Sequence, residues 1–378
     1  MPNARIIIVD DSAVVRQVLR NQLVRHEGIE VVATAADPFD AREKILALNP
    51  DCVILDLEMP KMDGLTFLRK LMKFHPVPVI VCSSLTPKGC SLAVDCLEAG
   101  AFEVVSKPGG NFSVGEVAAR LAELVRVAAS SRARTARLLS PQGANALSLG
   151  MTATPAPSIA TTLRATGPVL QQSRGGTDRL IAIGTSTGGT EALRVVLSEL
   201  TQDTPGIVMV QHMPEGFTKA FADRLNTLCR IEVKEAEDGD VVQTGRALLA
   251  PGNRHMRVAR EGTRWVVRVA DGPRVLRHKP SVEVLFESAA QVAGARAMGL
   301  IMTGMGGDGA TGLLSMRRAG AVTVAQDEQS CVVFGMPREA IRCGAVQVVA
   351  PLDRIAKLIA DYTAMRLVAE PSAVVTAA

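Results

Sequence analysis

Short runs of β-branched and aliphatic residues recur five times in the first 125 residues of this 378-residue chain, and an amphipathic stretch follows each run. Strand and helix repeats of this kind predict a doubly wound parallel sheet with right-handed crossovers. Functional side chains are then expected at the carboxyl ends of the strands. The predicted strands are residues 6–9, 30–33, 52–55, 77–81 and 103–105.

The same alternation returns in the second half of the chain, which predicts a second α/β domain with a doubly wound parallel sheet. Between the two halves, residues 140–176 are rich in Ala, Ser, Thr, Pro and Gly without a helical or strand period, which indicates a flexible linker. We predict a first domain at 1–127, a linker at 128–176, a second domain at 177–370 and a frayed tail at 371–378. The strands of the second domain are predicted at 180–183, 207–210, 247–250, 265–269, 299–302 and 322–325.

Composition limits the possible partners. Aromatic residues are only 3% of the chain and the net charge is +4 without a basic arm, which argues against nucleic-acid binding. The seven cysteines form no C-x-x-C pair and mostly lie in apolar stretches, as expected in a reducing compartment. No signal-peptide core and no apolar run of about 18 residues is found, so we predict a cytoplasmic protein without membrane insertion.

Five polar residues fall at the carboxyl ends of predicted strands in the first domain. Asp10 and Asp11 follow the first strand and Asp56 ends the third. Three carboxylates that converge at one edge of a sheet favour a shared cation, and oxygen ligands suit Mg²⁺. Ser83 and Lys107 end the fourth and fifth strands, where a hydroxyl and an ammonium could contact a phosphoryl group on Asp56. Acids at strand ends also commonly cap helices or face solvent, so the joint arrangement carries the prediction.

In the second domain, a predicted strand runs into the segment Gly184-Thr-Ser-Thr-Gly-Gly189, and an amphipathic helix follows. Gly184, Ser186 and Gly188 match G-x-S-x-G in a strand, turn and helix context, which would place a nucleophilic Ser186 at a helix amino terminus. A plain glycine turn remains an alternative. A phosphate-binding loop is less consistent, because the spacing matches neither G-x-G-x-x-G nor the P-loop.

A nucleophilic serine needs a base and an orienting acid. His212 ends the strand at 207–210 and is the first candidate base, His255 is the rival and His278 the third. Asp308 lies in a glycine-rich turn after the strand at 299–302, where it could orient the histidine or cap the next helix. The backbone N–H of Met305 in the same turn could bind an oxyanion. The chain order Ser, His, Asp differs from the Ser, Asp, His order of α/β-hydrolases, so the motif does not imply that fold.

Residues 3 to about 127 resemble the receiver domain of two-component response regulators, which is flavodoxin-like. The resemblance implies Mg²⁺-dependent phosphoryl transfer from a histidine kinase to Asp56, and a cis peptide before Pro108. One departure concerns the aromatic residue that the family usually has three positions before the lysine, since Val104 stands there. The resemblance is carried by Asp10-Asp11, Leu55-Asp-Leu-Glu-Met-Pro60, Asp63-Gly64, Ser83-Ser84 and Lys107-Pro108.

Residues 179 to about 358 resemble the catalytic domain of the chemotaxis protein-glutamate methylesterases of the CheB type, which implies a Rossmann-like three-layer α/β/α fold. In that family's pattern Ser186 is the nucleophile, His212 the base and Asp308 the orienting acid, and Met305, Thr187 and Gly188 support the oxyanion. The motifs are Gly184-Thr-Ser-Thr-Gly-Gly189, Gln211-His-Met-Pro214, Ala250-Pro-Gly252, Pro280-Ser-Val-Glu-Val-Leu-Phe286, Thr303-Gly-Met-Gly-Gly-Asp-Gly309 and Cys331-Val-Val-Phe-Gly-Met-Pro-Arg338.

This resemblance implies hydrolysis of methyl esters on glutamate side chains of chemoreceptors, with release of methanol, and deamidation of glutamines to glutamate. It implies no cofactor for the esterase reaction. Phosphorylation of Asp56 would relieve occlusion of the esterase cleft by the receiver. Two alternatives remain at this stage. One is a receiver-regulated serine hydrolase that acts on another ester or amide. The other is a DNA-binding output domain, for which no basic recognition helix is visible.

Overall fold

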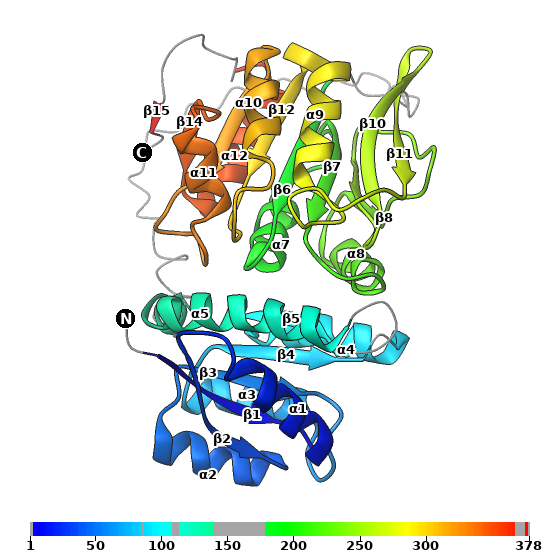
Figure 1. The fold of residues 1–378 in the computed structure, drawn as a ribbon. Coiled ribbons are helices and arrows are strands. Elements are labelled where there is room, and N and C mark those ends of the chain that lie inside the picture. The colour runs from blue at the N-terminus through cyan, green and yellow to red at the C-terminus, as the bar shows by residue number, and fades with distance from the viewer. Residues whose placement is uncertain (1–2, 85, 108–112, 139–177, 367–374, 377–378) are drawn as a thin grey trace, which may run out of the picture.

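The structure, a computed structural model, describes residues 3–84, 86–107, 113–138, 178–366 and 375–376. The first domain is a parallel sheet of five strands in the order β2-β1-β3-β4-β5, as the repeats predicted. Helices lie on both of its faces (Figure 1). Its elements are β1 (Ala4–Val9), α1 (Ala13–Leu23), β2 (Ile29–Ala35), α2 (Pro38–Leu48), β3 (Cys52–Asp56), α3 (Gly64–Phe74), β4 (Val79–Ser83), α4 (Pro87–Glu98), β5 (Glu103–Ser106) and α5 (Val114–Leu138).

The second domain is built on an eight-stranded sheet in the order β15-β14-β13-β12-β6-β7-β9-β8, and its strand pairs are parallel. The sheet strands are β6 (Leu180–Thr185), β7 (Gly206–Gln211), β8 (Glu232–Glu235), β9 (Arg246–Leu249), β12 (Ala297–Ile301), β13 (Val322–Gln326), β14 (Val348–Ala350) and β15 (Val375–Thr376).

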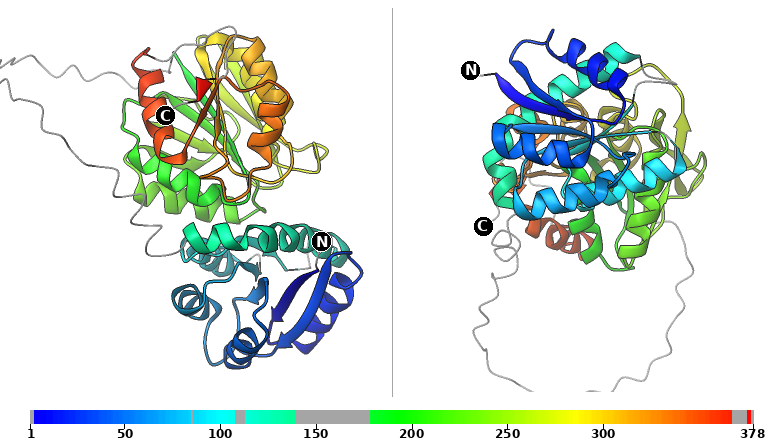
Figure 2. Two further views of the ribbon diagram at one scale, coloured as in Figure 1. Left: turned by 90° about the vertical axis from the view of Figure 1, so that its left-hand side faces the viewer. Right: turned by 90° about the horizontal axis from the view of Figure 1, so that it is seen from below.

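Two groups of helices sandwich this sheet and give the three layers that we expected (Figures 1 and 2). One group packs together on one face, and the other group packs on the opposite face with its own buried core. The first group is α7 (Gly189–Glu199), α8 (Phe217–Leu228) and α12 (Leu352–Thr363). The second is α9 (Val282–Ala293), α10 (Ala310–Arg318) and α11 (Met336–Arg342), with the 3₁₀ turn η1 (Gly294–Arg296) after α9.

The predicted strand at 265–269 exists, but it does not join the parallel sheet. It is part of β11 (Arg264–Ala270), which pairs in antiparallel fashion with β10 (His255–Glu261) in a separate hairpin. The reason lies in its side chains. Only Trp265, Val266 and Val267 are buried, and the two ends of the strand are exposed or partly exposed, from Arg264 to Ala270. A ribbon that reaches into solvent suits this pattern better than the parallel sheet, in which strands such as β7 and β12 are buried along their whole length.

The predicted domain and linker boundaries differ in places from the ends of the observed helices and strands. Helix α5 continues to Leu138 and therefore passes through residue 127, the predicted end of the first domain. Residues 139–176 of the predicted linker lie outside the described residues. Within the predicted frayed tail, β15 pairs with β14 through Val348 and Val375. In the described part of the chain, no helix is long and apolar enough to cross a membrane.

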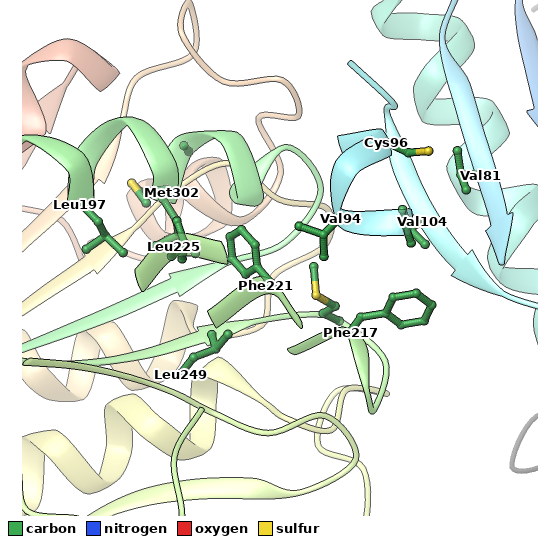
Figure 3. Close-up of a cluster of buried hydrophobic side chains, with 14 of the residues drawn as sticks. Val81, Val94, Cys96, Val104, Leu197, Phe217, Phe221, Leu225, Leu249 and Met302 are labelled. Carbon is green, nitrogen blue, oxygen red and sulfur yellow. The ribbon is translucent and has the colours of Figure 1, made fainter. Parts of the chain in front are cut away.

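The two domains meet through α4, β5 and α5 of the first domain, which face the second (Figure 1). Phe217 and Phe221 of α8 belong to one buried cluster with Val94 of α4 and Val104 of β5 (Figure 3). An ion pair adds to this contact, because Arg224 donates two hydrogen bonds, of 2.6 and 2.8 Å, to the carboxylate of Glu98. The core of the second domain thus runs without interruption into the receiver.

The packing of α9 against the sheet and α10 sets the geometry of the second domain. Phe286 is fully buried on α9. A Cβ atom added to Gly184 would lie 3.2 Å from its Cζ, and one added to Gly312 would lie 2.8 Å from its Cβ. The two glycines therefore let β6 and α10 approach this aromatic side chain closely.

We predict that Phe286→Ala lowers the free energy of unfolding of the second domain by about 3–5 kcal/mol, because it leaves a cavity that the glycine-lined walls cannot fill. Phe286→Leu is the matched control and should cost clearly less. Urea unfolding followed by the fluorescence of Trp265, the single tryptophan, measures the effect in this domain. Equal stability of the Ala variant and the native chain would contradict the prediction.

Candidate active site

Ser186 follows β6 in a tight turn that the glycines make possible. Gly188 has a φ of 78°, in the left-handed region, and is the residue from which α7 begins. Gly304 passes close by, since a Cβ atom at that position would lie 2.8 Å from Cβ of Ser186. The Ser186 N–H donates to the carbonyl of Thr303 at 3.0 Å, so this N–H is not free to bind a substrate oxygen. The side chain of Ser186 is buried.

The parallel pairing of β6 and β7 brings His212 beside Ser186. Thr185 and Gln211 are register partners, and the N–H of His212 donates to the carbonyl of Thr185 at 3.1 Å. The Gln211 amide donates to the carbonyls of Ser186 at 2.9 Å and His212 at 3.3 Å, while its oxygen accepts from the Thr185 hydroxyl at 2.6 Å. Gln211 therefore ties the two segments together. Gln211 was not among the predicted site residues. Its position at a strand end, directly before His212, is the sequence feature that could have indicated a role.

Asp308 is the most fully bonded side chain of the site. Its Oδ2 lies 2.7 Å from Nε2 of His212 and accepts from the N–H of Val282 at 2.7 Å. Its Oδ1 accepts from the Ser281 hydroxyl at 2.7 Å and from the N–H of Glu283 at 3.1 Å. Burial alone would raise the pKa of Asp308, but the hydrogen bonds from His212, Ser281 and Val282 bring it below its ordinary value.

The alternative role of Asp308 was a cap for the helix that follows it. That helix, α10, starts from Gly309 and has no side-chain cap. The carboxylate instead binds the amino terminus of α9, where free N–H groups and the helix dipole favour negative charge. The Asp308 carboxylate thus holds a helix end and the His212 ring at the same time.

The bond to Asp308 determines which nitrogen of His212 can act as a base. An ionised Asp308 only accepts hydrogen bonds, so Nε2 of His212 carries the proton and Nδ1 keeps a lone pair. Nδ1 and Oγ of Ser186 are both buried, and neither has a hydrogen-bond partner among the described residues. Two buried polar atoms without partners need an explanation, and a site that awaits a substrate is one.

The rival histidines occupy different places. His255 lies in the hairpin, where its Nε2 bonds to the carbonyl of Pro273 at 2.8 Å. This contact ties the start of β10 to the segment that follows β11. His278 stacks on the ring of His212, with ring centroids 3.8 Å apart and an angle of 3° between the planes. Burial and the nearby His212 lower the pKa of His278 to about 3, so its ring is neutral near pH 7.

A cavity of about 340 Å³ opens at this site, and both domains line it. Glu103 of β5 is buried there, and burial raises the pKa of its carboxyl against the opposing influence of Arg120, Thr187 and His212. The receiver therefore forms one wall of the cavity that opens beside His212. Residues that line the cavity from the second domain include His212, His278, Met305 and Gly306, and those from the receiver include Glu103, Glu116, Arg120 and Glu123.

The acidic pocket of the receiver is assembled as the strand-end rule predicted. Oxygen atoms of Asp10, Asp11 and Asp56 all lie within 4.8 Å of one another, a set that fits a hard cation with oxygen ligands. The Lys107 ammonium lies 2.7 Å from Asp56 and 3.1 Å from Asp10. Burial would lower the pKa of Lys107, yet the two carboxylates raise it overall. Burial raises the pKa of Asp10, although Lys107 opposes this.

Ser83 lies at the same edge but is bonded elsewhere. It is fully buried, and its hydroxyl donates to the carbonyl of Gly89 in the first turn of α4 at 3.1 Å. Val104 is buried in the contact with α8 rather than exposed on the receiver surface. The predicted cis peptide before Pro108 lies outside the described residues.

Comparison with known proteins agrees with this geometry. Residues 181–359 match the family model CheB methylesterase, and residues 6–116 match the response regulator receiver domain. The chain is 52% identical to a protein-glutamate methylesterase/protein-glutamine glutaminase of the group 3 operon of Rhodopseudomonas palustris, with 94% of this chain and 95% of that protein covered. It is 51% identical to protein-glutamate methylesterase/protein-glutamine glutaminase 2 of Chromobacterium violaceum, with coverage of 94% and 99%.

Among solved structures, the catalytic domain of the Thermotoga maritima CheB methylesterase is 34% identical, covers 49% of this chain and 97% of its own, and has a TM-score of 0.47. The two matched regions lie in the same order as the two domains described above. At about half identity over 94% of its length, this chain belongs to the family of protein-glutamate methylesterases/protein-glutamine glutaminases that carry a receiver domain.

Proposed function

We propose that this protein hydrolyses methyl esters of glutamate side chains in chemoreceptors and deamidates specific glutamines to glutamate, under control of its receiver. The observation that carries the proposal is a buried Ser186 at the end of β6, next to the end of β7, from which His212 contacts Asp308 at 2.7 Å. Family membership supplies the substrate class. A serine hydrolase acting on another ester or amide is the alternative, and membership at this identity does not favour it.

In the first step, Oγ of Ser186 attacks the ester carbonyl while Nδ1 of His212 takes its proton. The tetrahedral intermediate collapses when His212 returns the proton to the methoxy oxygen, so methanol leaves and an acyl-serine remains. A water molecule, deprotonated by His212, then attacks the acyl group. Ser186 recovers its proton and glutamate is released. With a glutamine substrate the same sequence releases ammonia instead of methanol.

Asp308 supports both steps through His212. It keeps the proton on Nε2 and stabilises the imidazolium that forms after proton transfer. For the oxyanion we infer two donors, the backbone N–H of Met305 and the hydroxyl of Thr187. Met305 lines the cavity, and the buried Thr187 hydroxyl faces the Glu103 carboxyl of the docked receiver, which it would give up when the receiver moves away. Gly188 supports them by holding the turn in its left-handed conformation.

We infer that Asp56 accepts a phosphoryl group from a histidine kinase, the partner class that a receiver domain implies. Asp10, Asp11 and Asp56 would hold Mg²⁺, which supplies positive charge to offset that of the phosphoryl oxygens. Lys107 is placed to contact the phosphoryl group, since its ammonium already lies 2.7 Å from Asp56. Ser83 would supply a hydroxyl after leaving its bond to Gly89.

Regulation follows from the position of the receiver over the cleft. In the docked arrangement Glu103 and Arg120 occupy the mouth of the cavity beside His212. A receptor segment can enter only when the receiver moves away, so phosphorylation acts by favouring the open arrangement.

The direct test of the function is release of labelled methanol from methylated receptor membranes. We predict that Ser186→Ala lowers the rate by at least about 10³-fold, because no nucleophile remains. The variant should still be phosphorylated on Asp56, and Asp56→Asn should show the reverse pattern, with basal esterase activity and no phosphorylation. Substantial methanol release by Ser186→Ala would end the assignment of the nucleophile.

We predict that Asp308→Asn lowers kcat by about 10³–10⁴-fold with a smaller effect on KM, because an amide can donate to Nε2 and stabilise the wrong tautomer of His212. Asp327→Asn is the matched control, since Asp327 follows the neighbouring strand β13 and bonds only locally to Ser330. Kinetics with both variants measure the difference. Equal losses in the two variants would show that Asp308 acts through stability alone.

We predict that Arg224→Glu raises the activity of the unphosphorylated chain by about two- to fivefold, because it replaces an attractive interdomain pair with two carboxylates. The double variant Glu98→Arg with Arg224→Glu restores the pair in reverse and should return activity to the native level. Methanol release without a phosphodonor measures both. Activation that persists unchanged in the double variant would argue against inhibition by docking.

A further inference from the structure

His278 has no role in the proposed mechanism, yet its ring lies flat on the ring of His212. The centroids are 3.8 Å apart and the planes differ by 3°. A parallel neighbour at van der Waals distance blocks rotation of His212 out of its plane. The His212 ring is therefore fixed in two ways, by Asp308 at its edge and by His278 on its face.

The two residues before His278 form a tight turn with an unfavourable backbone conformation, and this turn places the His278 ring against His212. Val275 and His278 exchange two hydrogen bonds, of 3.0 and 2.8 Å, across the two-residue turn Leu276-Arg277. Leu276 has a φ of 47° and Arg277 a φ of 70°, both left-handed. Such a turn normally takes Asn-Gly, because larger side chains are disfavoured in the left-handed region. Left-handed backbone at two residues with side chains persists when the surrounding structure fixes it, and here it fixes the position of His278.

The same segment reaches the acid of the site. Three residues after His278, the Ser281 hydroxyl donates to Asp308, and the N–H of Val282 does the same. One short stretch of chain thus contacts both His212 and Asp308. A shift of this stretch would disturb the base and its orienting acid together.

We propose that His278 is a positioning residue for His212, whose stacked ring holds the plane of the imidazole so that Nε2 stays on Asp308 and Nδ1 stays available as the base. The inference rests on the proposed function, since it assumes that His212 is the base. His278 also excludes water from one face of His212. As a neutral ring it adds no repulsion when His212 takes up a proton during the reaction.

The charges around His278 keep it neutral through the working range of pH. Burial, His212, Arg120 on α5 of the receiver and Arg277 on its own turn disfavour a proton on its ring, and Asp308 favours one. When the receiver moves away, Arg120 and the part of the burial that the receiver supplies are lost, whereas His212, Arg277 and Asp308 belong to the same domain as His278.

The test compares His278→Ala with His278→Phe in the full chain, phosphorylated on Asp56, by kinetics of methanol release from receptor membranes. The Ala variant should lower kcat by about 10- to 100-fold with little change in KM, because His212 loses its fixed orientation. The Phe variant keeps a flat ring on His212 and should stay near the native kcat. Equal losses in both variants, or none in either, would overturn the proposal.

The pH profile of kcat/KM separates positioning from a structural role. In the Ala variant water reaches the exposed face of His212 and solvates its charged form, so the acid limb should move to higher pH. In the Phe variant the limb should stay in place. Loss of activity without any movement of the limb would mean that His278 supports only the fold, and Trp265 fluorescence during urea unfolding measures that contribution directly.

Two results distinguish this inference from the proposed function. If Ser186→Ala keeps its activity, the assignment of the nucleophile fails and the role of His278 fails with it. If Ser186→Ala is inactive but His278→Ala behaves as the native chain, only the positioning role is wrong.

Discussion

The arrangement of the second domain depends on one carboxylate. Asp308 accepts from the Ser281 hydroxyl and from the N–H groups of Val282 and Glu283, and it lies 2.7 Å from His212. A buried carboxylate without these partners would be strongly disfavoured, whereas a helix amino terminus supplies donors and favourable dipole charge. The helix that anchors Asp308, α9, is itself fixed by Phe286 against the sheet. Packing of an apolar helix thus determines where the Asp308 carboxylate lies.

Coupling between the two sites also follows from contacts that are already in place. The Ser83 hydroxyl bonds to Gly89 at the start of α4, and α4 carries Val94 and Glu98 into the contact with α8. If Ser83 turns toward a phosphoryl group, α4 loses that bond. Val104, where the receiver family usually has an aromatic residue, packs with the same cluster. Valine has no aromatic ring, so switching at this position cannot use an aromatic rotamer.

Sequence reasoning allowed correct placement of residues at the ends of predicted parallel strands, because a strand end has a known place in the sheet. Strand ends meet at one edge of a parallel sheet, so Asp10 and Asp56, and likewise Ser186 and His212, could be placed near each other without coordinates. It did not find Gln211 or the stack of His278, because those roles depend on contacts between loops far apart in sequence. It also placed residues 265–269 in the main sheet. Their pattern identifies a strand, but only long-range packing decides which sheet the strand joins.

Some contacts between the domains favour docking and others oppose it, so the net free energy of docking is small. A small net free energy suits a state that must be reversed. Burial of Phe217 and Phe221 against the receiver favours docking, while ion pairs such as Arg224 with Glu98 are exposed and contribute little. Burial of Glu103 at the cleft opposes docking, because a carboxyl with a raised pKa gives up hydration to enter it. Moving a population from 99% docked to 99% open takes about 5.5 kcal/mol. A few charge-assisted hydrogen bonds to a phosphoryl group supply a free energy of that order, which is enough to reverse weak docking.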